Sequence, residues 1–194
     1  TGTASHVFSN AWSSTASLSQ RFQTTGGAGS AACKLDFADV STSVTRFDRF
    51  YINVPAMPAT GTVVYEVWDT ISGAPVAQLE LQPGGTLQLK DRFTNEDTVT
   101  LGTGESRVEV GILNDQMTVR IYSGANLHTE NISDSDIISL DLGANTYDEI
   151  RFGIVTSVNT WTMYIDEHKA SQSAWVGSAY PNWGNQSTYS DVIM

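Results

Sequence analysis

The sequence predicts an all-β fold in which antiparallel strands form a two-sheet β-sandwich. Apolar and polar residues alternate over many short segments, and Gly, Pro, Asn and Asp cluster between these segments. No apolar pattern with helical spacing is sustained over about eleven residues. The length of 194 residues suits a single domain, because all-β sandwiches often reach this size without dividing.

Eight segments have the composition and the period-two alternation of strands. In chain order they are residues 49–54, 62–68, 75–81, 86–90, 107–112, 117–122, 149–155 and 160–166. The third and fourth form a predicted hairpin, because Pro83-Gly84-Gly85 supplies the positive-φ positions of a tight connection. The fifth and sixth form another, joined by residues 113–116. Both hairpins place apolar side chains on one face, as antiparallel sheets with one solvated face require.

Other segments have weaker patterns. Residues 23–30, rich in Thr and Gly, predict a flexible loop, and residues 134–138 fit at most one turn of helix. The segment 178–194 is polar with interspersed aromatics. We therefore expect one domain over residues 1–177 and a C-terminal tail, residues 178–194, that packs on the body or on a neighbour. The first residues do not resemble a signal peptide and indicate a mature or truncated end.

Charge and composition exclude several classes of partner. Lys and Arg total 10 against 21 Asp and Glu, so the net charge is −11. Such a chain repels polyanions, so we expect no nucleic-acid binding, and it lacks the ~20-residue apolar run of a membrane span. Acidity favours solubility, cations or neutral partners such as sugars. Cys33 is the only cysteine, which excludes an internal disulfide and favours a small core residue. The Lys-poor, Thr-rich composition is typical of an extracellular or virion-surface protein.

The order of these segments resembles that of a known superfamily. The resemblance lies in residues 47–51, 78–89, 107–124 and 161–177. In these stretches the chain is similar to the concanavalin A-like lectin/glucanase superfamily, the laminin-G-like jelly rolls. The resemblance implies a jelly-roll sandwich. Because such domains are frequent in bacteriophage tail and surface proteins, it also implies a virion or a secreted surface protein as the setting.

The resemblance also indicates where enzymes of this superfamily place their chemistry. Its glycosidases use a Glu-x-Asp-x-x-Glu strand, which this sequence lacks; Asp166 and Glu167 are adjacent and should point to opposite faces. Its lyases use an Arg-Ser/Thr-Glu-Leu-Arg strand and a Gln-Ile-His strand. Residues 106–110 echo the first and nothing matches the second. Since an acidic polymer should be repelled by a charge of −11, we predict that the protein is not an enzyme.

Binding of sugars requires less: aromatic platforms and a few polar groups. The candidate ligand-binding residues are Trp68, Asp69, Arg107, Glu109 and Trp183. Trp183 has a loop-like context, whereas Trp68 fits either the core rim or an exposed platform. Arg107 and Glu109 form either a solvated or cross-strand charge pair or a sugar contact. Alternation places Trp161 in the core, and Trp175 is expected to close it.

The oxygen-rich loop around Asp134 and Asp136 is a candidate calcium site, and no other cofactor is expected. The predicted function is a non-catalytic carbohydrate-binding or adhesion module of a virion or secreted surface protein, with a glycan or cell-surface polysaccharide as its partner. The alternative is a structural virion protein, for capsid decoration or tail assembly, with virion subunits as partners. The third hypothesis is a polysaccharide-degrading enzyme.

Overall fold

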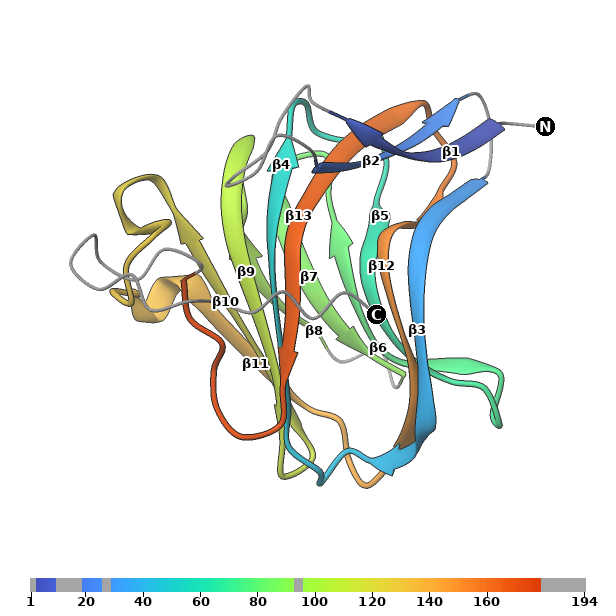
Figure 1. Ribbon diagram of the computed structural model, residues 1–194, viewed down its shortest axis with the longest axis vertical. Helices are drawn as coiled ribbons and strands as arrows, with labels where there is room; N and C mark the ends of the chain where they lie inside the picture. Colours follow the sequence, from blue (N-terminus) through green and yellow to red (C-terminus); the bar gives the residue numbers. More distant parts are fainter. Residues whose placement is uncertain (1–2, 10–18, 26–28, 93–95, 179–194) are drawn as a thin grey trace.

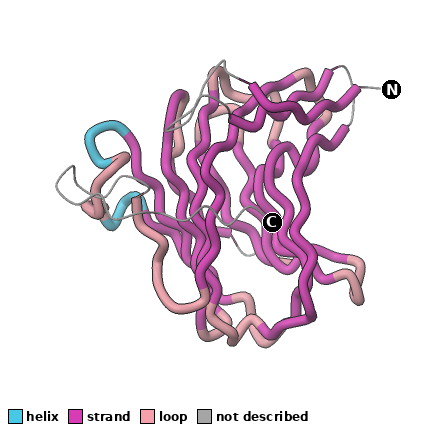
Figure 2. Tube along the Cα trace, viewed as in Figure 1, coloured by secondary structure: helices cyan, strands magenta, loops and turns pink. Residues whose placement is uncertain are grey.

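The computed structural model describes residues 3–9, 19–25, 29–92 and 96–178, and within them the strands form two stacked antiparallel sheets (Figure 1; Figure 2). The seven-stranded sheet has the order β1 (Thr3–Ser9), β2 (Ser19–Thr25), β13 (Trp161–Ser171), β4 (Arg46–Val54), β9 (Gly104–Leu113), β10 (Gln116–Ser123), β11 (Ile137–Asp141). The six-stranded sheet has the order β3 (Gly29–Ser41), β12 (Thr146–Ser157), β5 (Thr62–Asp69), β6 (Ala74–Leu81), β7 (Thr86–Asp91), β8 (Glu96–Thr100). Two short 3₁₀ helices, η1 (Gly124–Asn126) and η2 (Asp134–Asp136), lie between β10 and β11.

The predicted all-β, two-sheet antiparallel sandwich is confirmed. Each of the eight predicted strands coincides with a strand of the structure, and the single helical turn predicted near residue 134 is η2. Five strands escaped the sequence prediction: β1, β2, β3, β8 and β11. The flexible loop predicted over residues 23–30 is wrong in part, because β2 continues to Thr25 and β3 begins at Gly29.

Both predicted hairpins are present. β6 pairs with β7 across a turn in which Gly85 has a φ of 82°, and β9 pairs with β10 across Asn114 and Asp115. These two residues have φ values of 51° and 61°, which are the left-handed conformations that a tight two-residue hairpin turn requires. The second hairpin fixes the register between β9 and β10 of the seven-stranded sheet.

The apolar core lies between the two sheets. On β9, Val108, Val110 and Ile112 face this core, so the residues between them face away from it. Trp161 is 5% exposed and belongs to the core, as predicted. Within the described residues no helix is long and apolar enough to cross a membrane.

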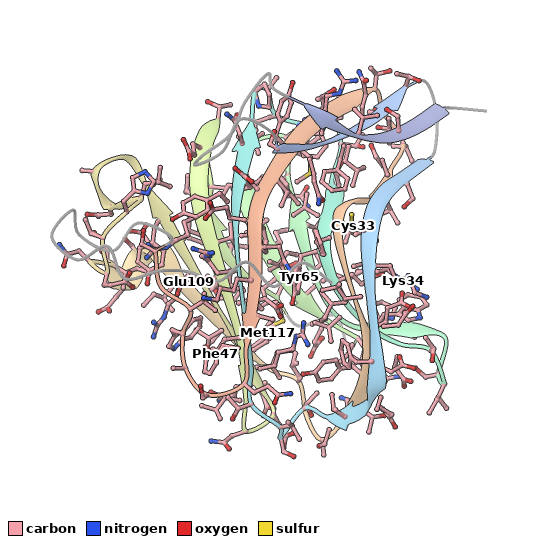
Figure 3. The ribbon with its side chains drawn as sticks, viewed as in Figure 1. Cys33, Lys34, Phe47, Tyr65, Glu109 and Met117 are labelled. Atoms are coloured by element: carbon pink, nitrogen blue, oxygen red, sulfur yellow. The ribbon has the colours of Figure 1, made fainter. Side chains whose placement is uncertain are left out.

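A polar cluster is enclosed between the sheets. Asp48 of β4 is almost wholly buried and accepts hydrogen bonds from Arg46, from His168 of β13 and from the Tyr65 hydroxyl of β5. Figure 3 shows Tyr65 between the sheets. Although burial opposes ionisation, the hydrogen bonds from His168 and Arg46 hold the pKa of Asp48 below its usual value. This cluster ties the two sheets together.

Candidate functional site

Three neighbouring strands bring charged and aromatic side chains to the outer face of the seven-stranded sheet. Cross-strand pairing aligns them in two rows. In the order β4, β9, β10, the first row is Tyr51, Arg107 and Tyr122, and the second is Arg49, Glu109 and Arg120. Because facing alternates along a strand, both rows lie on the face opposite the core. In Figure 3, Glu109 lies on the side of its strand away from Tyr65.

Arg107 and Glu109 form a buried ion pair at the centre of these rows. Both side chains are wholly buried, and Arg107 Nε lies 3.2 Å from Glu109 Oε1. The guanidinium of Arg107 also donates to the carbonyl oxygens of Leu127 and Thr129, at 3.2 and 2.8 Å. It lies 3.7 Å from the centroid of the Tyr122 ring, in cation–π geometry. The sequence predicted either a solvated or cross-strand charge pair or a sugar contact. In the structure the two residues lie on one strand, β9, and their ion pair is wholly buried.

The Glu109 carboxylate has unused capacity for hydrogen bonds. Neither of its oxygens has a hydrogen-bond partner among the described residues, although both are buried. Burial raises the pKa of Glu109, and the charge of Arg107 opposes this shift only in part. A buried carboxyl that lacks donors is costly for a fold, so it usually indicates a site shaped for something other than stability.

Arg49 makes only weak polar contacts in this cluster. It is 5% exposed, and its Nε is buried without a hydrogen-bond partner. Two of its polar contacts are long: Nη1 donates to the Gly177 carbonyl at 3.4 Å, and Nη2 lies 3.8 Å from Glu167. The guanidinium lies 5.4 Å from the ring centroid of Tyr51, two residues along the same strand.

A β-bulge in β13 brings Glu167 to this face. Its φ is 50°, and the pairing between β13 and β4 shifts register between Asp166 and Lys169. Asp166 pairs with Tyr51 of the outer face, and Glu167 reaches Arg49 of the same face. The regular alternation that predicts opposite faces for Asp166 and Glu167 does not hold here, because the extra residue interrupts it.

His128 joins the cluster from the loop between β10 and β11. Its ring centroid lies 5.9 Å from that of Tyr51. Desolvation lowers the pKa of His128, and the charge of Arg107 lowers it further. The imidazole is thus neutral near pH 7 and can accept a proton. Sequence reasoning passed over His128 because it lies in no strand motif; the loop that also carries the carbonyl partners of Arg107 places it here.

Residues 175–178 cover part of this face. Trp175 packs against Phe47, with ring centroids 4.9 Å apart, and the Arg120 guanidinium lies 3.7 Å from its ring centroid. Figure 1 shows the segment after β13 turning back along the outer side of the seven-stranded sheet. The prediction that Trp175 closes the core is wrong, because its neighbours belong to the outer face.

The other predicted ligand residues lie elsewhere. Trp68 and Asp69 end β5 of the six-stranded sheet, so the structure does not bring them to Arg107 and Glu109. Asp69 accepts hydrogen bonds from the backbone N–H groups of Ile71 and Ser72, and contacts with Ser72 lower its pKa. This carboxylate therefore stabilises the turn into β6. Trp183 lies outside the described residues.

Asp134 and Asp136 form the 3₁₀ turn η2, next to β11. No group of three or more His, Cys, Asp or Glu side chains suited to a metal ion occurs in the part of the chain that the structure describes. Calcium binding by these two residues stays a prediction.

Comparisons with known proteins place the fold. No protein-family model matches the chain, and no curated protein matches it in sequence. Among solved structures, a family 7 alginate lyase in complex with its substrate matches with a TM-score of 0.58 and 13% identity, over 80% of this chain and 78% of that chain. A cellulose-induced protein matches with a TM-score of 0.60 and 12% identity, over 91% of this chain and 88% of the other. A family 18 polysaccharide lyase matches with a TM-score of 0.53 and 8% identity, over 77% and 82%.

These likenesses show a concanavalin A-like jelly-roll sandwich, the fold that the sequence resemblance implied. They also correct the functional prediction. A non-catalytic carbohydrate-binding module without enzyme activity is contradicted, because the matched structures include several polysaccharide lyases. The virion setting gains no support from these structures.

Proposed function

We propose that this protein is a polysaccharide-degrading enzyme, a lyase that cleaves acidic polysaccharides by β-elimination on the outer face of its seven-stranded sheet. Its fold likeness to alginate lyases supports this class. The observation that carries the proposal is the placement of Arg49, Tyr51 and His128 on one face, where each can serve a different step.

β-Elimination at a uronate needs three groups. A cation must stabilise the carboxylate next to the carbon that loses its proton, since negative charge develops there. A base must accept that proton, and an acid must protonate the departing glycosidic oxygen. The electrons of the broken C–H bond form a double bond to the neighbouring carbon, and its C–O bond breaks. No water is consumed, and one product carries an unsaturated sugar.

The site supplies a group for each step. Arg49 retains an unpartnered Nε and binds the substrate carboxylate. Neutral His128 accepts the proton, because its lowered pKa keeps the imidazole unprotonated near neutral pH. Tyr51 lies beside both and protonates the leaving oxygen through its hydroxyl. Arg107 and Glu109 form the floor and hold the loop that carries His128, through the Leu127 and Thr129 carbonyls.

A net charge of −11 does not by itself exclude an acidic substrate, because it describes the whole chain and not this face. Three of the chain's ten Lys and Arg residues gather in two adjacent rows here, although Glu109 and Glu167 lie beside them. A local field decides what a surface attracts. An extracellular location, in solution or on a virion, stays a prediction and would give such an enzyme access to polysaccharides.

The test is product formation from a panel of uronate-containing polysaccharides. A lyase releases chains whose conjugated double bond absorbs in the ultraviolet. Tyr51→Phe and His128→Gln should each lower kcat by about 10²–10⁴-fold, because each removes a proton-transfer group. Tyr147→Phe is the matched control: Tyr147 lies on β12 of the six-stranded sheet, away from the two rows.

Tyr147→Phe should retain wild-type kcat. New reducing ends without ultraviolet absorption would identify a hydrolase instead. Cleavage that survives both Tyr51→Phe and His128→Gln would show that the reaction does not use this face.

A further inference from the structure

A short described segment, residues 175–178, occupies the face that the proposed function assigns to the substrate. It follows β13 and returns along β4, β9 and β10 without joining the sheet as a strand. We call residues 175–178 the strap. Its contacts fall on the same groups that the proposed reaction uses.

The indole of Trp175 anchors the strap over Gly111. A Cβ atom at position 111 would lie 2.7 Å from Trp175 Cη2 and 2.9 Å from Cζ2, closer than real contacts allow. Glycine weakens a strand interior, and it often marks a place where another group approaches the backbone closely. Because Gly111 has no side chain, the indole can pack directly against the backbone of β9. The Arg120 guanidinium lies 3.7 Å from the ring centroid of Trp175.

The rest of the strap engages the catalytic groups. The Gly177 carbonyl accepts from Arg49 at 3.4 Å, and the Ser178 hydroxyl lies 3.2 Å from the Tyr51 hydroxyl. The Ser178 N–H donates to Glu130 at 2.9 Å. A carbonyl oxygen facing Arg49 and a hydroxyl facing Tyr51 are the kinds of group that a uronate sugar would present there.

From these contacts we propose that the strap is an autoinhibitory element, which acidic polysaccharide must displace before it reaches Arg49 and Tyr51. This inference rests on the proposed function. The contacts suit a reversible cover: those to Arg49 and Tyr51 are long, and residues 175–178 are all only half-buried. When only the open fraction of a protein binds, its apparent affinity falls by that fraction. The strap therefore raises KM and leaves kcat unchanged.

Two substitutions open the strap by independent routes. Trp175→Ala removes the indole, whereas Gly111→Ala keeps the indole and places a methyl group where it packs. Each should lower KM for the polysaccharide about tenfold without changing kcat. Each should also speed amide hydrogen exchange in peptides that span residues 172–178, measured without substrate.

Trp68→Ala is the matched control. Trp68 lies on the six-stranded sheet beneath Arg151, with the guanidinium 3.9 Å from its ring centroid, nearly the geometry of Trp175 and Arg120. Its loss should leave both KM and exchange in residues 172–178 unchanged.

The outcomes separate the two proposals. Wild-type KM in Trp175→Ala and Gly111→Ala, with cleavage intact, would overturn autoinhibition and leave the lyase function standing. A fall in kcat in both variants would also overturn it, because the strap would then belong to the substrate site. If neither wild type nor the variants cleave any acidic polysaccharide, the proposed function fails and autoinhibition fails with it.

Discussion

The outer faces of the two sheets are built from the same residue types, yet they differ in how their charges are satisfied. On the six-stranded sheet, Glu66 accepts from Gln78 at 2.5 Å and from Arg151 at 2.9 Å. Glu149, on the same sheet, pairs with both Lys34 and Arg151, although its Oε2 is buried without a hydrogen-bond partner among the described residues. Figure 3 shows Lys34 on the opposite side of the molecule from Glu109.

On the seven-stranded sheet, by contrast, the buried Glu109 has one ion-pair neighbour and no hydrogen bond within the described residues. Cross-strand ladders of the first kind stabilise a solvated surface. A carboxyl with both oxygens short of donors, beside an arginine with an unpartnered Nε, needs an explanation other than fold stability, and the proposed function supplies one. The contrast separates a structural surface from a candidate site more clearly than residue type does.

The largest expected effect is on the free energy of unfolding, and it should distinguish Arg107 of the seven-stranded sheet from Arg151 of the six-stranded sheet. Arg107→Ala should cost about 3–5 kcal/mol of unfolding free energy, because it leaves Glu109 buried without its ion-pair partner. Arg151→Ala should cost only about 1 kcal/mol, since Glu66 keeps Gln78 and Glu149 keeps Lys34. Urea unfolding followed by circular dichroism measures both. Equal losses would show that the two faces do not differ in this way.

The next effect is on the pH dependence of activity. Burial and Arg107 lower the pKa of His128 below 6.5, so the neutral base persists to lower pH than an ordinary histidine. The acidic limb of kcat/KM should therefore have its midpoint below pH 6.5 and fall about tenfold per pH unit beneath it. Asp69→Asn, on the six-stranded sheet, should leave the profile unchanged. A midpoint above 6.5 would exclude His128 as the base.

The smallest effect concerns Glu109 itself. Because burial raises its pKa in the folded state, the unfolded chain ionises first, and stability falls as pH rises from about 4.5 through the raised value. Glu109→Gln removes this dependence. As pH rises from 4.5 to 7, the unfolding free energy of the variant should therefore increase relative to that of wild type. Glu66→Gln should instead destabilise the fold at pH 7, by about 1 kcal/mol. An identical response of both variants would contradict the assignment of Glu109 as an unsatisfied carboxyl.

Sequence periodicity predicted the centre of the fold and missed its margins. Four of the five unpredicted strands, β1, β3, β8 and β11, are the outer strands of the two sheets. An edge strand needs few buried side chains: in β8 only Val99 is buried. Its polar composition therefore lacks the alternation that reveals a central strand such as β9.

The site was predicted only in part, for a related reason. Arg107 and Glu109 stood out because they share a strand motif. His128 and Trp175 reach the face from segments outside the strands, and Arg49 depends on a register that sequence does not give. Gly111 carried a usable signal, since a glycine inside an apolar strand indicates a close approach.

The β-bulge at Glu167 has a consequence for both halves of the molecule. One inserted residue directs Glu167 outward to Arg49 and lets His168 turn inward to Asp48, so consecutive side chains serve the surface and the interior. Deleting Glu167 would restore regular pleating, with Asp166 still opposite Tyr51 on the outer face and His168 next to it facing the interior. The inserted residue thus adds a carboxylate beside Arg49 without taking the imidazole away from Asp48.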